Sequence, residues 1–245
     1  MQILTIANQK GGTAKTTTAA AIAQAAAAQG FKVLAIDLDP QANYTFALKA
    51  STQTAGAYDL LEGTAARNTI QKTSINNIDV IASSKNLATV TTSKGSANRL
   101  KNALQPIKNI YDYIVIDTPP TASELLFNAL QASTGLIIPL QADTFGLQGL
   151  YQIADTARQV QRSNPALQIK GYVLTRHNDR SNLTRILADK IQEQAEQLNI
   201  KKLAEIREGI AIKEAIALQL SMFEYNPKAK PIQDYMNLFD EIRKD

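Results

Sequence analysis

Lysines, threonines and glycines near the start of the chain have the composition of a phosphate-binding loop. Residues 9–17 read Gln-Lys-Gly-Gly-Thr-Ala-Lys-Thr-Thr and follow the apolar run Ile3–Ala7. Glycines let backbone amides approach phosphate oxygens, and a helix that starts near Lys15 adds its positive N-terminal end. Gln9 stands where the usual P-loop spacing places a glycine, and Lys10 is an additional lysine. We therefore predict a nucleotide-phosphate site that contains one lysine more than a standard P-loop.

The side chains of this loop have different expected tasks. Lys15 should reach the β- and γ-phosphates of a nucleoside triphosphate. Thr16 should offer its hydroxyl to Mg²⁺, and Thr17 should offer a hydroxyl to the α-phosphate. An ordinary glycine-rich turn without a ligand is the alternative, and it gives no reason for a Lys-Thr-Thr helix start. The residues expected to bind the nucleotide here are Lys10, Gly11, Gly12, Thr13, Ala14, Lys15, Thr16 and Thr17.

Carboxylates follow two other apolar runs. Asp37 and Asp39 come after Lys32–Ile36 and flank a single leucine, so in a strand their side chains would share a face. Asp117 ends the apolar run Tyr113–Ile116 in the manner of a Walker B element. Beside a triphosphate, such carboxylates suit metal binding through water and the orientation of an attacking water. If the sequence had no phosphate loop, Asp37 and Asp39 could equally well be two solvated aspartates in a turn.

Composition narrows the classes of protein to which the chain can belong. The 245 residues include no cysteine, which excludes a disulfide and a zinc–thiolate site. His177 is the single histidine, which argues against a multi-histidine metal site. We see no signal peptide and no run of about 18 apolar residues, so we expect a cytoplasmic protein without a membrane span. The length and the 44% hydrophobic content fit one domain with an aliphatic core.

Positive charge is distributed unevenly along the chain. The formal net charge is +4, and residues 158–230 hold 13 Lys and Arg against 8 Asp and Glu. Residues 231–245 are net acidic, with 2 basic and 4 acidic residues. The basic stretch is either an ordinary solvated surface or a face that binds a polyanion.

Strand-like and helix-like patterns alternate throughout the sequence. Short apolar runs without in–out alternation are typical of parallel strands covered on both faces. Residues 15–28 are rich in alanine, which favours a helix, and helical periodicity of apolar residues appears at 146–162 and 182–198. The alternation predicts an α/β fold, a single-domain doubly wound and mostly parallel sheet flanked by helices, with its ligand beyond the carboxyl ends of the strands. The predicted strands are Ile3–Ala7, Lys32–Ile36, Ile78–Ile81, Tyr113–Ile116, Leu136–Pro139 and Tyr172–Leu174.

Two stretches lack a clear pattern. Within residues 43–76 we expect only short helices around Leu60-Leu61 and Ala65-Ala66. Residues 83–98 are rich in Ser, Thr, Lys and Asn, which indicates a surface loop or a weak helix.

Taken together, these motifs resemble the ParA/MinD family of deviant Walker A ATPases, and within it the ParA (Soj-like) partition ATPases. The resemblance extends along nearly the whole chain, with residues 44–110 the least clear part. It includes Gln9–Thr17, Asp37–Asn43, Asp117–Pro120, Asn128–Leu130, Ile138–Leu140, Gly146–Leu150, Leu174–Arg176, Arg180, Ile206-Arg207, Glu214-Ala215 and Glu224–Lys228.

The resemblance implies tasks for individual residues. Lys10 would be the signature lysine, which reaches across a dimer interface to the phosphates of the other subunit, so that ATP joins two subunits. Asp39 would position the hydrolytic water, and Asp37 and Asp117 would serve the Mg²⁺ region. Thr175 and Arg176, with Ile206 and Arg207, would lie near adenine and ribose. Ala14 stands where the family usually has glycine; we expect a right-handed backbone there, because the residue leads straight into a helix.

The resemblance also implies partners. The family binds DNA without sequence preference as an ATP-bound homodimer, and a ParB-like centromere-binding protein or a cargo adaptor stimulates its slow hydrolysis. A single ParA-type domain over 1–245 without an N-terminal helix-turn-helix would place the protein among the short ParA types, associated with the nucleoid. DNA-binding candidates are Arg180, Arg185, Lys201, Lys202, Arg207, Lys213, Lys228 and Lys230.

The C-terminal segment separates this interpretation from the main alternative, a MinD-like ATPase that cycles on membranes. MinD-like proteins end in a basic amphipathic helix. Here Tyr235, Leu238, Phe239 and Ile242 share one face, whereas Asp234, Asp240, Glu241 and Asp245 lie on the other. An anionic membrane would repel that acidic face, so we expect the helix to pack on the core. A metabolic or metal-maturation enzyme of the same fold is a further alternative, although such relatives often use cysteine. The expected protein is therefore a Mg²⁺-dependent ATPase that drives plasmid or chromosome partition, or cargo positioning.

Overall fold

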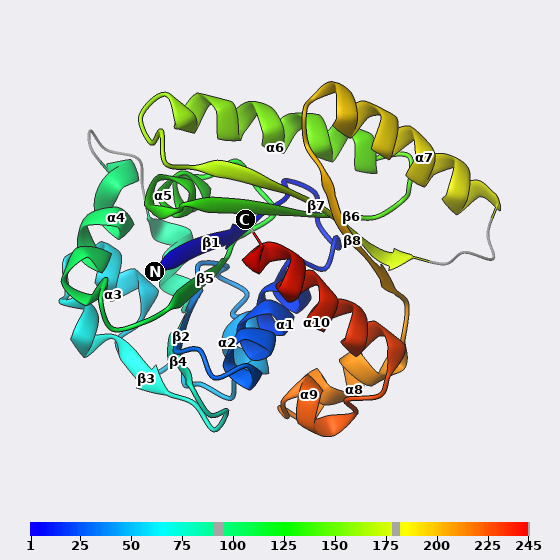
Figure 1. The fold of residues 1–245 in the computed structure, drawn as a ribbon. Helices are drawn as coiled ribbons and strands as arrows, with labels where there is room; N and C mark the ends of the chain where they lie inside the picture. Colours follow the sequence, from blue (N-terminus) through cyan, green and yellow to red (C-terminus); the bar gives the residue numbers. More distant parts are fainter. Residues whose placement is uncertain (91–95, 178–181, 245) are drawn as a thin grey trace.

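A single mixed sheet forms the centre of the molecule. The computed structural model describes residues 1–90, 96–177 and 182–244. Within them, eight strands follow the order β3-β4-β2-β5-β1-β6-β7-β8 (Figure 1). Every neighbouring pair is parallel except β3 with β4. This arrangement confirms the predicted doubly wound, mostly parallel α/β fold. The strands are β1 Gln2–Ile6, β2 Val33–Asp37, β3 Ile70–Lys72, β4 Ile78–Ile81, β5 Tyr113–Asp117, β6 Gly135–Leu140, β7 Gln168–His177 and β8 Lys202–Arg207.

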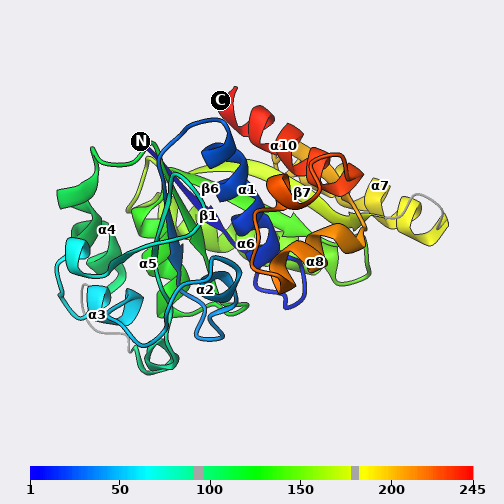
Figure 2. The same cartoon turned by 90° about the horizontal axis from the view of Figure 1, so that it is seen from below.

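Helices cover both faces of this sheet. On one face lie α1 and α10, with α2, α8 and α9 beside them, and on the other lie α3 to α7 (Figures 1 and 2). None of the helices in the described ranges has the length and apolar character that crossing a bilayer requires. The helices are α1 Lys15–Ala28, α2 Asn43–Ala47, α3 Ala57–Leu61, α4 Arg99–Leu104, α5 Glu124–Ala132, α6 Gly146–Gln161, α7 Asn182–Gln197, α8 Ile210–Ala217, α9 Met222–Tyr225 and α10 Lys230–Arg243, with short 3₁₀ turns at η1 Ala66–Asn68, η2 Lys85–Thr89, η3 Ser96–Asn98 and η4 Gln105–Ile107.

The alanine-rich composition of α1 explains its place in the fold. Eight of its residues are alanine or isoleucine at 7% exposure or less, and the helix lies between the sheet and α10. Small side chains let a helix approach a sheet and a second helix together, because little volume separates the backbones. The apolar face of α10, with Tyr235 and Phe239 almost fully buried, closes this layer. The expectation that the C-terminal helix packs on the core is confirmed.

Two strands were missed by the sequence patterns. In strand β8, exposed charged residues are interspersed with buried apolar ones, and β3 has two half-buried residues followed by the exposed Lys72. Both are edge strands, which need not show the continuous apolar run of a doubly covered strand. The predicted helices at 15–28, 146–162 and 182–198 agree with α1, α6 and α7 within one residue. The short helices expected within 43–76 correspond to α3 and η1, and α2 precedes them.

Strand register brings the chemistry of the chain to one edge of the sheet. Strand β1 lies between β5 and β6, so the order of connections reverses beside it. Ile6 at the end of β1 and Asp37 at the end of β2 both pair with Asp117 at the end of β5. The loop that follows β1 leads into α1 at this switch point, where open α/β sheets bind their ligands.

Candidate functional site

The glycine-rich loop between β1 and α1 is open in the way that a phosphate cradle requires. A Cβ atom built on Gly11 or Gly12 would meet no atom within 4 Å, and Gly12 has a φ of +78°. Hydrogen bonds hold the loop from outside: Asn8 Oδ1 accepts from the Lys10 amide at 2.9 Å, and Gln141 Nε2 donates to the Gly12 carbonyl at 2.9 Å. The loop is therefore fixed while its inner surface stays free for a ligand.

Lys15 and Thr16 lie at the base of this loop, at the start of α1. Lys15 is only 7% exposed, and its Nζ donates to the Lys10 carbonyl at 3.1 Å. Burial lowers the pKa of Lys15, and the nearby carboxylates of Asp117 and Asp39 oppose that shift. Thr16 Oγ1 donates to Asp117 Oδ2 at 2.6 Å. A cation and a hydroxyl thus lie together at the base of the loop, and both residues line the cavity in front of it.

Asp117 has the properties of a carboxylate prepared for a metal. It is fully buried, and its Oδ1 has no hydrogen-bond partner among the described residues. Burial raises its pKa well above the ordinary value, and the charge of Asp37 adds to the shift. An orphaned oxygen in a buried site is costly, and Mg²⁺ with its waters would satisfy it. The described residues contain no cluster of three His, Cys, Asp or Glu, so most ligands of such an ion would be waters, phosphate oxygens and the Thr16 hydroxyl.

Asp37, which we expect to serve the Mg²⁺ region, pairs in register with Asp117 at the end of the neighbouring strand. Its two carboxylate oxygens already accept hydrogen bonds from the amide of Asp39 and from the amide and hydroxyl of Thr45. The side chain is fully buried, and burial raises its pKa to about 6. The structure gives Asp37 a supporting position behind the site, at the end of β2 and against α2.

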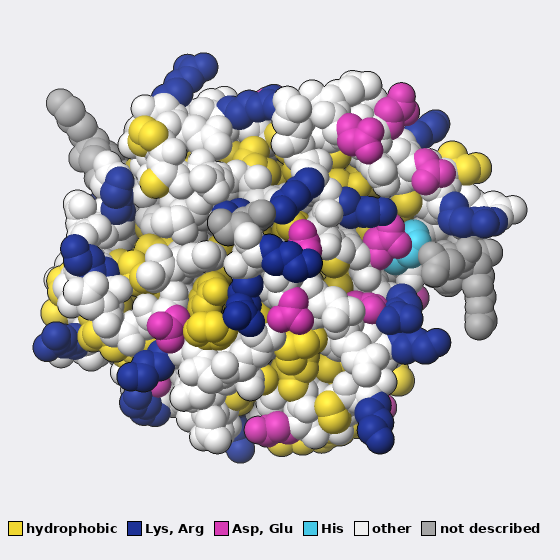
Figure 3. All heavy atoms as spheres, viewed as in Figure 1, with side chains coloured by type: hydrophobic (Ala, Val, Ile, Leu, Met, Phe, Trp, Pro, Cys, Tyr) yellow, Lys and Arg dark blue, Asp and Glu magenta, His cyan; other side chains and the backbone are white. Residues whose placement is uncertain are grey.

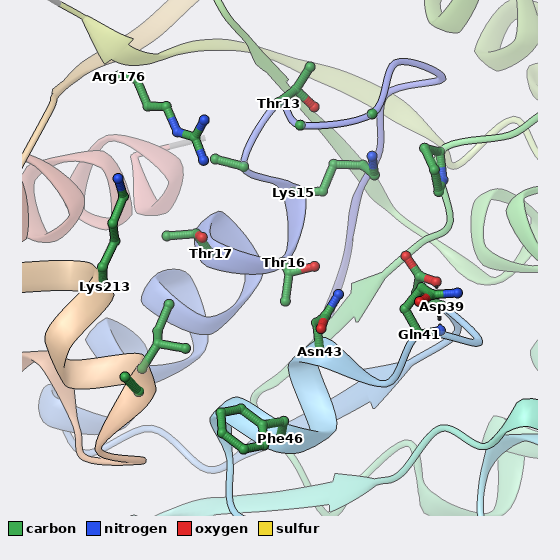
Figure 4. A pocket seen from close by; sticks show the side chains of 16 residues that line it. Thr13, Lys15, Thr16, Thr17, Asp39, Gln41, Asn43, Phe46, Arg176 and Lys213 are labelled. Atoms are coloured by element: carbon green, nitrogen blue, oxygen red, sulfur yellow. Dashed lines mark hydrogen bonds between the residues drawn. The ribbon is translucent and has the colours of Figure 1, made fainter.

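Asp39 instead lines an open cavity of about 660 Å³ in front of the loop. Figure 4 shows Asp39 and Gln41 on one side of this cavity and Arg176 and Lys213 on the other, with the start of α1 between them. The Gln41 amide donates to Asp39 Oδ1 at 3.0 Å. The lining residues are Gly11, Gly12, Thr13, Ala14, Lys15, Thr16, Thr17, Asp39, Gln41, Asn43, Phe46, Pro120, Arg176, Lys213, Ile216 and Ala217.

The expectation of a right-handed backbone at Ala14 is wrong. Ala14 has φ 64° and ψ 31°, in the left-handed region, directly before α1. Its carbonyl accepts from the Thr18 amide at 2.9 Å, which is the first helical hydrogen bond. The backbone must turn from the cradle into the helix within one residue, and that turn needs a positive φ. An alanine methyl makes this conformation costly, which accounts for glycine being usual at this place.

The Lys10 side chain is engaged within its own subunit, while the Lys10 backbone carbonyl accepts from Lys15 Nζ. Its ammonium donates to the Asp143 carboxylate in the segment between β6 and α6, in an ion pair. The same ammonium lies 5.6 Å from the centre of the Phe145 ring, a side chain that is 63% exposed. Both contacts come from residues more than 130 positions away in the sequence, so no local signal could have revealed them.

The residues expected around the base and ribose surround a second, smaller hollow. This hollow, of about 50 Å³, adjoins the main cavity at Ala14, Thr17, Arg176 and Lys213. Ile206 and Arg207 line it from the end of strand β8. Thr175 also borders it.

Two of these side chains already have protein partners. Thr175 Oγ1 donates toward the Thr13 and Leu140 carbonyls, at 3.2 and 3.1 Å, and so supports the phosphate loop from behind. The Arg207 guanidinium pairs with Asp234 on α10, with Nε 2.9 Å from Oδ2. Asp234 is only 9% exposed, which corrects its placement on the solvent face of that helix.

The DNA-binding candidates do not form one group. Arg180 lies outside the described residues. Lys201 and Lys202 pair with Glu241 and Glu205, and Lys213 lines the main cavity. Arg185 donates to Asn182 at the start of α7. Lys228 is exposed between α9 and α10, and Lys230 is exposed at the first position of α10. On the face shown in Figure 3, Lys and Arg side chains are spread across the surface and interspersed with Asp and Glu.

Several residues of the site carried no signal that we recognised in the sequence. Gln141 and Asp143 contact the loop from the segment after β6, and Phe46 lines the cavity from α2 although it is 51% exposed. A polar residue just beyond a buried strand end is the one pattern that could have indicated Gln141 and Asp143.

Comparisons of this chain with a family model and with known proteins agree with one another. A family model described as an AAA domain matches residues 1–169. The chain is 34% identical to the sporulation initiation inhibitor protein Soj of Bacillus subtilis over 98% of each chain. It is also 34% identical to the chromosome partitioning protein ParA of Caulobacter vibrioides, over 99% of this chain and 94% of that protein.

Solved structures agree with this result. An ATP complex of a Cyanothece McdA variant superposes with a TM-score of 0.86 at 26% identity, covering 100% of this chain and 95% of that one. Cobyrinic acid a,c-diamide synthase of Mycobacterium smegmatis, bound to an ATP analogue and magnesium, superposes with a TM-score of 0.84 at 28% identity, covering 98% and 93%.

Proposed function

Because this chain belongs to the ParA/MinD family of P-loop ATPases and resembles its Soj and ParA members, we propose that it is a Mg²⁺-dependent partition ATPase whose ATP-bound homodimer binds DNA. The observation that carries the proposal is the arrangement of Lys15, Thr16 and Asp117 around an open phosphate cradle. Solved relatives contain ATP or an ATP analogue with magnesium. The cavity beside the cradle, of about 660 Å³, is ample for a nucleoside triphosphate.

Each residue of the site has a chemical task in this proposal. Amides of Gly11 to Thr13 and the start of α1 bind phosphate oxygens, and Lys15 neutralises their charge. Thr16 and Asp117 would hold Mg²⁺, which would offset the negative charge of the phosphate oxygens. Asp39 orients the attacking water from the other side of the cavity. Arg176, Lys213, Ile206 and Arg207 border the volume for ribose and base.

Lys10 connects the nucleotide to dimer formation. Its ammonium is paired with Asp143 rather than directed into the cradle of its own subunit. We assign it to the phosphates of the second subunit, where its charge would stabilise the dimer only when a triphosphate is present. Hydrolysis removes the terminal phosphate and thereby weakens the interface. Stimulation by a ParB-like or cargo-adaptor partner would then control release.

DNA binding in this proposal depends on charge rather than on base contacts. The excess of Lys and Arg in residues 158–230 supports it, although these residues are spread over the surface of a single subunit. Joining two subunits would double the number of cations that face one duplex, and affinity for phosphates rises steeply with that number. DNA binding should therefore require ATP.

A mobility-shift experiment tests the proposal as a whole. The full chain is mixed with two unrelated DNA duplexes, with ATP and Mg²⁺, with ADP, or with no nucleotide. We expect equal retention of both duplexes with ATP only, and weaker binding as salt increases. The double variant Lys228→Glu/Lys230→Glu should bind DNA less tightly. The control variant Lys32→Glu should bind DNA as wild type does, because exposed Lys32 directly precedes β2, at the amino end of the strand. ATP-independent binding, or retention of liposomes instead of DNA, would contradict the proposal.

A further inference from the structure

A buried ring of hydrogen bonds joins the ends of β2 and β4 to α2. Asp37 Oδ1 accepts from the Asp39 amide at 3.0 Å, and Asp37 Oδ2 accepts from the Thr45 amide at 2.8 Å and the Thr45 hydroxyl at 2.7 Å. Thr45 Oγ1 in turn accepts from the Ser83 amide at 2.8 Å, and Ser83 Oγ donates to the Asp39 carbonyl at 2.6 Å. The ring therefore begins and ends on the backbone of Asp39.

The donors and acceptors of this ring have a fixed direction. The single proton of the Thr45 hydroxyl goes to the carboxylate of Asp37, so its oxygen can only accept from Ser83. The Ser83 hydroxyl donates to a backbone carbonyl, which has no proton to return. Asp37, Thr45 and Ser83 are at most 1% exposed. Water cannot replace a missing member of the ring without entering the core.

The hydrogen bond from Ser83 to the Asp39 carbonyl is not needed to satisfy that carbonyl. The Asp39 carbonyl already accepts from the Ala42 amide at 2.9 Å, so it is satisfied without Ser83. The hydroxyl of Ser83 adds a second donor to that carbonyl, while Asp37 holds the amide of the same residue. Both sides of the Asp39 backbone are thus fixed, and the Gln41 amide holds one oxygen of the Asp39 carboxylate at 3.0 Å.

We propose that Ser83 and Thr45 are positioning residues for ATP hydrolysis, which fix Asp39 in the orientation that directs the attacking water. This inference rests on the proposed ATPase function and on the assignment of the water to Asp39. Neither Ser83 nor Thr45 lines the cavity, so their removal should change turnover and leave nucleotide binding intact. Misplacement of a catalytic group by about 1 Å can lower the rate on the order of 100-fold.

The experiment compares Ser83→Ala with Ser133→Ala. Ser133 is equally buried, and its hydroxyl also donates to a backbone carbonyl, that of Ala129 at 2.7 Å, far from the cavity. ATPase rates and the affinity for a fluorescent non-hydrolysable ATP analogue are measured with Mg²⁺. We expect Ser83→Ala to lower kcat on the order of 10- to 100-fold, with analogue affinity within about twofold of wild type, and Ser133→Ala to retain kcat.

A second pair of variants keeps the inference testable if Ser83→Ala does not fold. Thr45→Val removes the hydroxyl and keeps the shape, whereas Thr45→Ser keeps the hydroxyl. We expect low kcat for Thr45→Val and recovery for Thr45→Ser. Wild-type kcat in Ser83→Ala or Thr45→Val would overturn the inference, as would a loss of analogue affinity equal to the loss of kcat. Absence of ATPase activity in the wild type would instead overturn the proposed function.

Discussion

Lys10 forms an ion pair with Asp143 of its own subunit, and the exposed ring of Phe145 lies beside the same ammonium. A lysine assigned to the neighbouring subunit's phosphates must leave this pair before it can reach them. The side chains of Lys10 and Asp143 are 24% and 37% exposed, so the pair is accessible to solvent and can be broken at small cost. In the proposed ATP-bound dimer, the pair would therefore compete with the contact between Lys10 and the neighbouring phosphates.

Removal of the carboxylate tests this competition. Asp143→Asn should lower the ATP concentration at which half of the chains dimerise by about two- to fivefold, because the ion pair no longer has to be broken. Size-exclusion chromatography with light scattering over an ATP titration measures the effect. Glu62→Gln removes a similar ion pair with Arg99 away from the cavity and should change nothing. Weaker dimerisation of Asp143→Asn would mean that Asp143 contributes to the interface itself.

Substitution of each of the two lysines in the loop should have a different effect on ATP binding and dimerisation. Lys15→Ala should abolish ATP binding, because Lys15 is the buried cation at the base of the cradle. Lys10→Ala should keep most of the binding and lose ATP-dependent dimers and partner-stimulated turnover. Isothermal calorimetry and light scattering distinguish the two outcomes. If Lys10→Ala formed ATP-dependent dimers normally, Lys10 would not contact the phosphates bound by the second subunit.

The water-orienting assignment of Asp39 predicts a trapped state. Asp39→Ala should bind ATP and dimerise, yet hydrolyse so slowly that the ATP-bound dimer accumulates. The nucleotide recovered from the isolated dimer, analysed by ion-exchange chromatography, should be ATP rather than ADP. Recovery of ADP at the wild-type rate would contradict the assignment.

The left-handed backbone of Ala14 predicts a stabilising substitution. Ala14→Gly should raise the free energy of unfolding by about 1 kcal/mol, because glycine adopts a positive φ without a Cβ clash. Ala20→Gly, in the interior of α1, should instead lower the free energy of unfolding by about 1 kcal/mol or more. Urea denaturation of the three proteins measures both changes. Destabilisation by Ala14→Gly would show that the strain is absent in solution.

The buried hydroxyl of Tyr235 predicts a pH dependence of stability. Tyr235 lies within hydrogen-bond distance of Thr18 Oγ1, at 3.2 Å, and burial raises its pKa from 10.0 to about 12. The unfolded chain then releases this proton before the folded one, so between pH 10 and 12 the free energy of unfolding falls by up to about 3 kcal/mol. Tyr235→Phe should lose that part of the slope, as measured by urea denaturation from about pH 9 to 12. An identical slope in both proteins would refute the raised pKa.

Local patterns were sufficient for much of the fold. Helix α1 and the covered strands β2, β4 and β5 are specified by composition and periodicity within a few residues, because each element buries its own apolar surface. The edge strand β8 was missed for the same reason, since its exposed charged residues belong to solvent on one side. The handedness of Ala14 was predicted wrongly, because the direction in which the chain leaves the cradle is set by the sheet and not by the helix.

The sequence by itself determined that the chain contains a phosphate loop with two lysines and carboxylates after two strands. Only the tertiary structure decided what those groups contact: Lys10 meets Asp143, Asp117 meets Thr16, and Ser83 reaches Asp39. These partners are between 44 and 133 residues apart in the chain. Such pairs depend on which strands lie side by side in the sheet, and no short stretch of sequence contains that order.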